Sequence, residues 1–273
     1  MNSIKTLLQK NKEPLIMGVL NITPDSFSDG GKFIDPTRAL NHTEIMIKNG
    51  IDIIDIGAES SRPGAKKIPI SLERERIEPV LKAIKKNFNI PVSIDTYKAE
   101  IMQLGIDHGA EMINDIYALG QPGSMETVLK SDTMLCLMHM QGTPQDMQDN
   151  PSYKNVTEEV RKFLKERINI CKKFGIDESR IILDPGFGFG KTYENNLKLF
   201  QSIDKLNSLE KPLLIGISRK KMIRKIVGNT ENDIIHGSAI MAAISVLRGA
   251  RIVRVHDIQE TKNALRILQL KEK

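Results

Sequence analysis

Short β-rich runs alternate with longer amphipathic stretches along the whole chain, and this alternation constrains the fold more than any other feature of the sequence. Apolar residues in the longer stretches recur at i, i+3 and i+4, which is the period of a helix with one buried face. Strands that alternate with helices form a parallel sheet covered by helices. The predicted strands are Leu15–Leu20, Ile51–Ile56, Pro91–Ile94, Glu111–Ile113, Met134–Met138, Ile181–Leu183, Leu213–Ile217 and Ile252–Val255. The predicted helices are Thr37–Lys48, Leu72–Lys86, Lys98–Asp107, Val156–Phe174, Asn195–Leu206, Gly237–Leu247 and Gln259–Leu270.

The number of predicted strands favours one of two parallel architectures. An open, doubly wound sheet also alternates strands with helices, and periodicity alone does not exclude it. Eight strands in 273 residues match the usual size of a closed TIM (β/α)₈ barrel. The sequence has no linker, composition shift or low-complexity block that would mark a second domain. We therefore expect residues 1–273 to form a single α/β barrel domain, with residues 1–14 as an N-terminal extension preceding the first strand.

Composition argues against several classes of protein. The net charge of +6 favours anionic ligands, but aromatic residues make up only 4% of the chain, tryptophan is absent and the lysines are dispersed. Nucleic-acid binding needs basic clusters with interleaved aromatic residues. The N-terminus is polar, no apolar run reaches the length of a membrane span, and the two cysteines form no disulfide framework. We therefore expect a soluble protein of the reducing cytoplasm that binds neither nucleic acid nor membrane.

Polar side chains follow the predicted strands, at the end of the barrel where enzymes of this fold place their chemistry. Any one of them could simply cap a helix or bond loop backbone, but a complete ring of them indicates a ligand site. One group suits a planar ligand with several N–H donors and a ring oxygen, such as an aminopyrimidinone. It consists of Asp95, Asn114, Asp184 and Lys220. A second group suits a phosphate or diphosphate. It consists of Asn21, Arg62, Arg254 and His256.

Three loops also carry candidate binding features. The run Asp184–Lys191 fits neither the P-loop nor the dinucleotide-binding pattern, because Pro185 and Lys191 occupy required glycine positions. Its glycines let the backbone turn tightly beside a ligand, and Phe189 offers a flat face. The loops of residues 21–31 and 60–67 are long and polar, and we expect them to close over substrate.

A metal is expected only together with an anionic substrate. The five histidines show no ligand spacing, which argues against a structural zinc site. A diphosphate ligand would bring Mg²⁺, held by phosphate oxygens, water and one protein oxygen from Asn21.

The chain resembles the dihydropteroate synthases in segments that span nearly its whole length in the expected order. The most specific segments are residues 18–31 and 184–191, and the others are residues 55–65, 93–96, 113–116, 138–144, 215–220 and 254–257. The resemblance implies a TIM barrel, usually a homodimer, that acts as a transferase in folate biosynthesis. Such enzymes join 6-hydroxymethyl-7,8-dihydropterin diphosphate to 4-aminobenzoate and release 7,8-dihydropteroate and diphosphate. Sulfonamides compete for the aminobenzoate site.

The resemblance also implies roles for the residues that match its motifs. The catalytic residues would be Asp95, Lys220, Arg254 and Asp184. The pterin-binding residues would be Asp95, Asn114, Asp184, Lys220, Met138, Phe189 and Ser61. The diphosphate-binding residues would be Asn21, Arg62, Arg254 and His256, with Mg²⁺ at Asn21. The 4-aminobenzoate-binding residues would be Phe27, Arg62, Pro63, Phe189, Ser218 and Lys220. We expect a dissociative, SN1-like substitution in which the two aspartates stabilise the pterin cation.

Three residues depart from the family pattern, and two other functions stay open. Ala58 and Ser61 replace a usual glycine and threonine, and Lys221 stands where a small residue is common. A methyltransferase that passes a methyl group from a methylated tetrahydrofolate to a corrinoid protein would share the barrel and the pterin site. It would not need the loop after Asn21 or the anion site at Arg254. A non-catalytic pterin-binding homologue would have no physical reason to keep either feature.

Overall fold

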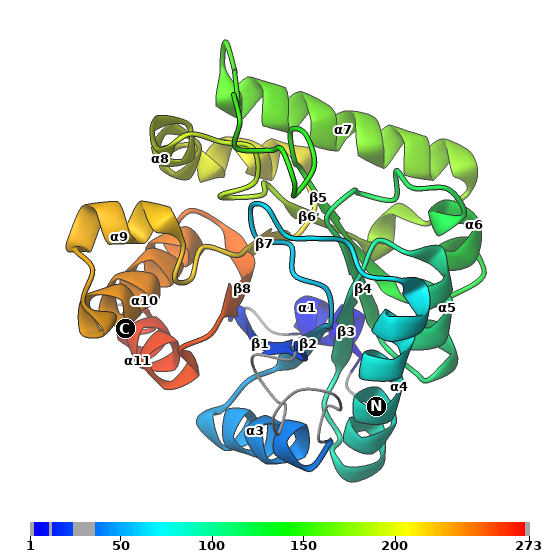
Figure 1. Cartoon of the computed structure of the whole chain (residues 1–273). Helices are drawn as coiled ribbons and strands as arrows, with labels where there is room; N and C mark the ends of the chain where they lie inside the picture. Colours follow the sequence, from blue (N-terminus) through cyan, green and yellow to red (C-terminus); the bar gives the residue numbers. More distant parts are fainter. Residues whose placement is uncertain (1–2, 11–12, 24–35, 271–273) are drawn as a thin grey trace.

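The computed structural model describes residues 3–10, 13–23 and 36–270, which form a closed barrel of eight parallel strands surrounded by helices (Figure 1). Each strand pairs with its neighbours in the sequence, and β8 closes the ring against β1, where Leu15 pairs with Ile252. The predicted TIM barrel is therefore confirmed. The strands are β1 Leu15–Asn21, β2 Ile53–Gly57, β3 Val92–Asp95, β4 Met112–Asp115, β5 Met134–Met138, β6 Ile181–Asp184, β7 Leu213–Ile215 and β8 Ala250–Val255. The α-helices are α1 Ile4–Lys10, α3 Pro36–Asn49, α4 Ile70–Asn87, α5 Ala99–Asp107, α6 Ser124–Leu129, α7 Val156–Phe174, α8 Tyr193–Gln201, α9 Lys221–Val227, α10 Glu231–Leu247 and α11 Ile258–Leu268; the 3-10 helices are η1 Glu178–Arg180 and η2 Ile203–Leu209.

Polar residues cap the starts of α7, α8 and α10. The Asn155 side chain accepts a hydrogen bond from the Glu158 amide at 3.2 Å and begins α7. Thr192 and Thr230 cap α8 and α10 in the same way. These caps satisfy amide groups that have no partner inside the helix. Both threonine caps place the helix start earlier than the predicted Asn195 and Gly237.

Short elements account for the other differences from the predicted boundaries. The sequence did not predict α6 or α9, each of which is too short for a clear helical period. The stretch predicted as one helix over Asn195–Leu206 divides into α8 and η2 at Ser202. Among the helices of the described residues, none is both long and apolar enough to cross a membrane.

Two apolar clusters hold the barrel together. The larger one lies between the strands and the outer helices. The smaller one fills the inside of the barrel near the strand starts and includes Met17, Ile53 and Met134. Within the predicted N-terminal extension, α1 adds the fully buried Ile4 to this inner cluster. Figure 1 shows α1 within the outline of the strand ring, so the opposite end of the barrel interior is the one left for polar residues.

Candidate active site

The inward-facing positions of the strands change from apolar to polar toward the strand ends. Successive strand side chains point to opposite faces, so Asp55 shares the inner face with Ile53, and Met138 shares it with Met134. The same phase places Asp95 and Arg254 inside the barrel. The chemistry therefore lies at the carboxyl ends of the strands, directly above the apolar floor.

Arg254 on β8 joins carboxylates from two other strands. Its Nε atom donates to Asp55 Oδ2 at 2.6 Å, and its terminal nitrogen donates to Asp95 Oδ2 at 2.9 Å. Asn114 Nδ2 donates to the same Asp55 oxygen at 3.2 Å. Asp55 is fully buried, and its other oxygen, Oδ1, has no hydrogen-bond partner in the described part of the chain. The arrangement connects β2, β3, β4 and β8 through one guanidinium.

This network differs from the predicted grouping in two ways. Arg254 was grouped with the anion-binding residues, but here it also belongs to the cluster expected to bind the planar ligand. Asp55 was not among the predicted site residues, because it lies inside a predicted strand rather than after one. A charged residue between isoleucines, two positions after the inward-facing Ile53, was the signal that could have revealed it.

The two buried aspartates of the mouth experience opposing effects. Burial raises the pKa of Asp95, and Asp55 and Glu73 raise it further, whereas Arg254 lowers it. Burial also raises the pKa of Asp184, whereas Lys220 and the Gly186 amide lower it. The Gly186 amide donates to Asp184 Oδ1 at 2.7 Å. Both carboxylates therefore depend on neighbouring cations to remain charged.

Lys220 extends from the residue before α9 toward the glycine-rich loop after β6. Its ammonium donates to the Phe187 carbonyl and lies 4.7 Å from the centre of the Phe189 ring. Burial lowers the pKa of Lys220 to about 8, although Asp184 opposes this shift. The predicted neighbours Asp184, Phe189 and Lys220 thus lie together on one side of the mouth.

The glycine-rich loop packs tightly against the segment after β5. A Cβ atom at Gly186 would lie 1.8 Å from the His139 carbonyl oxygen, and one at Gly190 would lie 2.3 Å from the Gln141 carbonyl oxygen. Both glycines have positive φ angles, so only glycine fits these two positions. Lys191 is buried between the segments and donates to His139 Nδ1 at 2.9 Å, Gly186 O at 2.8 Å and Phe189 O at 3.0 Å.

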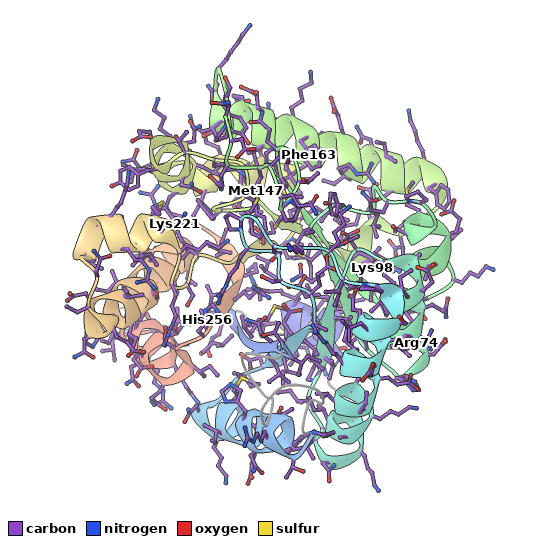
Figure 2. All side chains as sticks on the ribbon, in the orientation of Figure 1. Arg74, Lys98, Met147, Phe163, Lys221 and His256 are labelled. Carbon is purple, nitrogen blue, oxygen red and sulfur yellow. The ribbon has the colours of Figure 1, made fainter. Side chains whose placement is uncertain are left out.

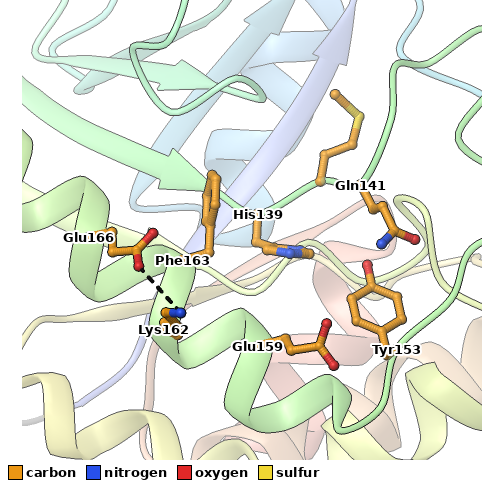
Figure 3. A pocket seen from close by; sticks show the side chains of 8 residues that line it. His139, Gln141, Tyr153, Glu159, Lys162, Phe163 and Glu166 are labelled. Atoms are coloured by element: carbon orange, nitrogen blue, oxygen red, sulfur yellow. Dashed lines mark ion pairs between the residues drawn. The ribbon is translucent and has the colours of Figure 1, made fainter.

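His139, the polar residue directly after β5, does not face the barrel mouth. It follows the inward-facing Met138 and therefore points outward. Figure 3 shows His139 with Tyr153 and Phe163 in a cavity of about 320 Å³ between the β5–α7 segment and α7. Burial and Lys191 lower the pKa of His139 to about 3, which keeps the ring neutral.

The residues predicted to hold an anion come from three parts of the barrel. Asn21 ends β1, Arg62 lies in the loop after β2, and Arg254 and His256 lie at the end of β8. Ser218 Oγ lies 3.1 Å from His256 Nδ1 and also accepts a hydrogen bond from the His256 amide at 3.2 Å. Desolvation lowers the pKa of His256, and Arg254 and Arg62 lower it further by repelling the charged ring. His256 lies at the end of β8 in Figure 2. Because the charge of Arg62 lowers the pKa of His256, Arg62 lies within electrostatic reach of the site, although its side chain is exposed.

The two substrate loops are described to different extents. Phe27 and most of the loop of residues 21–31 lie outside the described residues. The loop containing Ser61, Arg62 and Pro63 is described in full. At its tip, the Gly64 amide donates to the Pro144 carbonyl at 2.8 Å, which joins this loop to the segment after β5.

A family model of pterin-binding enzymes matches residues 17–256. The chain belongs to this family. The dihydropteroate synthase of Escherichia coli strain K12 is 41% identical over 256 residues, which cover 94% of this chain and 91% of the relative. The structure of the Yersinia pestis dihydropteroate synthase with a sulfonamide drug has a TM-score of 0.89 and 40% identity, and covers 94% of each chain.

The dihydropteroate synthase of Xanthomonas albilineans is similar in two ligand-bound structures. With 4-aminobenzoic acid, it has a TM-score of 0.88 and 40% identity, covering 94% of this chain and 93% of the other. With 7,8-dihydropteroate, it has a TM-score of 0.84 and 37% identity over the same shares. This pterin-binding enzyme therefore matches its relatives over nearly their full length.

The residues present at the mouth of this pterin-binding enzyme fit a magnesium ion that arrives with its substrate. No group of three or more histidine, cysteine, aspartate or glutamate residues could hold a metal ion within the described ranges. Gly57 on β2 lies between Asn21 and Asp95, because a Cβ atom there would contact Asp95 Cβ at 3.4 Å and Asn21 Oδ1 at 3.7 Å. One amide oxygen at the strand ends suits Mg²⁺, which keeps water and phosphate oxygens as its other ligands.

Proposed function

We propose that this chain is a dihydropteroate synthase, which joins 6-hydroxymethyl-7,8-dihydropterin diphosphate to 4-aminobenzoate and releases 7,8-dihydropteroate and diphosphate. The observation that carries the proposal is the cluster of Asp95, Asn114, Asp184 and Lys220 beside Arg254 at the carboxyl ends of the strands. It offers acceptors for a pterin and a cation for a leaving diphosphate within one site. The relatives bound to 4-aminobenzoic acid, dihydropteroate and a sulfonamide support both the reaction and sulfonamide inhibition.

The pterin ring would lie across the mouth between the two aspartates. Asp95 and Asp184 accept hydrogen bonds from the amino group and ring N–H groups, and Asn114 can both donate and accept. Lys220 donates to the ring oxygen while its ammonium is charged, below a pKa of about 8. Met138 and Phe189 cover the two faces of the ring, and Ser61 contacts it from the loop after β2.

The bond to break joins the pterin methylene carbon to the diphosphate oxygen. Asp95 and Asp184 stabilise the positive charge that develops on the pterin when this bond breaks. Arg254 already lies 2.9 Å from Asp95, so it stabilises the leaving diphosphate next to the reacting carbon. Arg62, Asn21 and His256 contact the remaining oxygens. Mg²⁺ held at Asn21 would supply further charge neutralisation to the diphosphate when bound.

The second substrate attacks the carbon from the side of the two loops. Ser218, Arg62 and Pro63 would contact 4-aminobenzoate beside Phe189 and Lys220, together with Phe27. The neutral aromatic amine is the nucleophile, and it releases one proton after the new C–N bond forms. Closure of the loops keeps water from reacting with the cation. The Ser218 hydroxyl lies 3.1 Å from His256 Nδ1, and this proximity supports an aminobenzoate site beside the diphosphate site.

The enzyme acts as a homodimer that forms through α9 and α10. Exposed apolar residues on these helices include Val227, Ile240 and Leu247, of which Leu247 is 61% exposed. The two helices pack together at Gly237, where a Cβ atom would lie 2.8 Å from Ile223. A surface with several exposed aliphatic residues on adjacent helices is typical of a contact between identical chains. Sedimentation of an Ile240→Lys variant, which would shift the protein toward a monomer, tests this contact.

The cytoplasm is the compartment in which this enzyme works. The two cysteines, Cys136 and Cys171, are buried free thiols. Free thiols of this kind are typical of a reducing compartment.

Formation of dihydropteroate tests the proposed reaction directly. The protein is mixed with Mg²⁺ and the dihydropterin diphosphate, with and without 4-aminobenzoate, and the product is followed by chromatography. We expect dihydropteroate only when both substrates are present, and less of it when a sulfonamide is added. Tight pterin binding with no product would contradict the proposal and would favour a methyltransferase or a non-catalytic pterin-binding protein.

A further inference from the structure

A buried lysine lies at the base of the loop that contains Ser61, Arg62 and Pro63. Lys98 precedes α5, and its side chain is only 10% exposed. Its Nζ atom donates to Glu59 Oε2 at 2.6 Å and to the Ile68 carbonyl at 2.7 Å. Glu59 directly precedes the loop of residues 60–67 and Ile68 directly follows it, so one ammonium connects both ends.

A second contact closes the same base. The Ile68 amide donates to Glu59 Oε2 at 3.1 Å, which joins the two ends of the loop directly. Tyr97 donates its hydroxyl to Glu59 Oε1 at 2.8 Å. Both oxygens of Glu59 are therefore occupied, and residues 59–68 form a compact loop with adjacent ends.

Lys98 is itself fixed to the barrel beside the proposed pterin site. Its third partner is Glu73 Oε2 in the first turn of α4, at 2.6 Å. The other oxygen of Glu73 accepts a hydrogen bond from Thr96 at 2.7 Å, and Thr96 directly follows Asp95. Figure 2 shows Lys98 beside α4, away from His256. The lysine thus connects the loop to the end of β3 through Glu73 and Thr96.

Away from its base, the loop has few restraints. The Arg62 amide donates to Ser60 Oγ and the Ala65 amide donates to the Arg62 carbonyl, and both contacts are local. The Gly64 contact with Pro144 connects the tip to another loop. The position of Arg62 therefore depends on the base of the loop together with the single Gly64 contact at its tip.

We propose that Lys98 is a positioning residue that fixes the loop of residues 59–68 over the aminobenzoate side of the active site. The inference rests on the proposed function, because that function assigns Ser61, Arg62 and Pro63 to the substrates. Loss of the ammonium removes the contacts that hold both ends of the loop to α4, whereas the Ile68 and Tyr97 contacts of Glu59 and the pterin contacts on the strands stay in place. The effect therefore falls mainly on 4-aminobenzoate, because the loop supplies Arg62 and Pro63 to this substrate, whereas Ser61 is one of several pterin contacts and the others lie outside the loop.

The test compares Lys98→Met with Lys98→Arg and with Lys86→Met. Lys86 is an exposed lysine near the end of α4, so its replacement is the matched control. We expect Lys98→Met to raise the KM for 4-aminobenzoate roughly tenfold or more, because a hydrogen-bonded charge at a loop base is lost. The Kd for 6-hydroxymethylpterin, measured by calorimetry, should change less than about twofold, a difference that corresponds to under 1 kcal/mol. Lys98→Arg should restore most of the aminobenzoate affinity.

Two further variants keep the test valid if Lys98→Met folds poorly. Lys98→Met combined with Glu73→Gln removes one of the two carboxylates that would be left without a partner. Glu59→Gln weakens only the contact with the loop and should raise the same KM by a smaller factor. A folded variant with an unchanged KM for 4-aminobenzoate, or with an equal loss of pterin affinity, would overturn the proposal.

Hydrogen–deuterium exchange separates this proposal from the proposed function. Amides of residues 59–70 should exchange faster in unliganded Lys98→Met than in the wild-type protein or Lys86→Met. Faster exchange in Lys98→Met, together with no dihydropteroate from the wild-type protein, would support Lys98 as the loop anchor and refute the proposed reaction. Unchanged exchange would refute the anchor whatever the protein catalyses.

Discussion

Replacing Lys191 by methionine should destabilise the protein by removing an ammonium buried between two tightly packed segments. The side chain donates to the Gly186 and Phe189 carbonyls and to His139 Nδ1. Each buried acceptor left without a donor costs about 1–3 kcal/mol. Water cannot easily take the place of the lysine, because Gly186 and Gly190 leave no room between the two backbones.

An opposing effect reduces this cost. Burial lowers the pKa of Lys191 well below its usual range, which means that the charged form is strongly desolvated in the folded protein. Methionine does not incur this penalty and fills a similar volume, so part of the loss is offset. The cost of three acceptors without donors still exceeds the desolvation penalty that methionine avoids. We therefore expect the free energy of unfolding to fall by about 1–3 kcal/mol.

Urea denaturation at pH 7.5 measures this difference in the free energy of unfolding. Lys198→Met is the matched control, since this lysine is exposed on α8 and its replacement should change stability by less than about 0.5 kcal/mol. A Lys191→Met protein as stable as the control, or more stable, would show that the three contacts do not hold the loop and would refute the reasoning.

Three further predictions concern ionisable groups in the site and in the segment after β5. Asp95→Asn should lower kcat far more than it weakens pterin binding, because the carboxylate stabilises charge that develops only as the bond breaks. Equal losses in steady-state kcat and in pterin affinity would mean that Asp95 only holds the ring. The pKa of His139 should be about 3 by NMR titration, with Nε2 carrying the proton. Because this folded value lies below the unfolded value of about 6.5, stability should be lost as the pH falls from about 6.5 to 3. A His139→Gln variant with the same acid sensitivity as the wild-type protein would contradict this prediction. Pterin affinity should fall above pH 8 as Lys220 loses its proton, and Lys220→Arg should abolish this loss of affinity. Calorimetry from pH 7 to 9.5 measures the affinity of both proteins. No difference between them would count against the role of Lys220.

The sequence predicted the barrel because eight repeats of apolar strands and amphipathic helices leave few alternatives. It did not predict α1, because a helix of seven residues that buries only Ile4 has too weak a periodic signal. Ser202 likewise interrupts a helical pattern that continues in the sequence, because the chain turns there into η2.

The candidate site was predictable where side chains follow strands and less so where they lie within them. Asp95 and Asp184 end their strands, and both lie at the mouth as expected. Asp55 lies inside β2, where a sequence pattern gives no indication that an arginine from β8 will meet it. The partner of Arg254 depends on closure of the barrel, which brings the first and last strands together. His139 points outward because the side chain of Met138 before it points inward. This alternation can be assigned only when the last residue of β5 is known.

Calorimetric titration with 6-hydroxymethylpterin tests the central claim most directly, namely that the polar cluster at the strand ends binds the pterin. The wild-type protein and Lys86→Met should bind this ligand with equal affinity. Asp184→Asn should bind it at least tenfold more weakly, because a charged acceptor of ring N–H groups is lost. Equal affinity in Asp184→Asn would contradict the account, because it would place the pterin outside the cluster of Asp95, Asn114, Asp184 and Lys220.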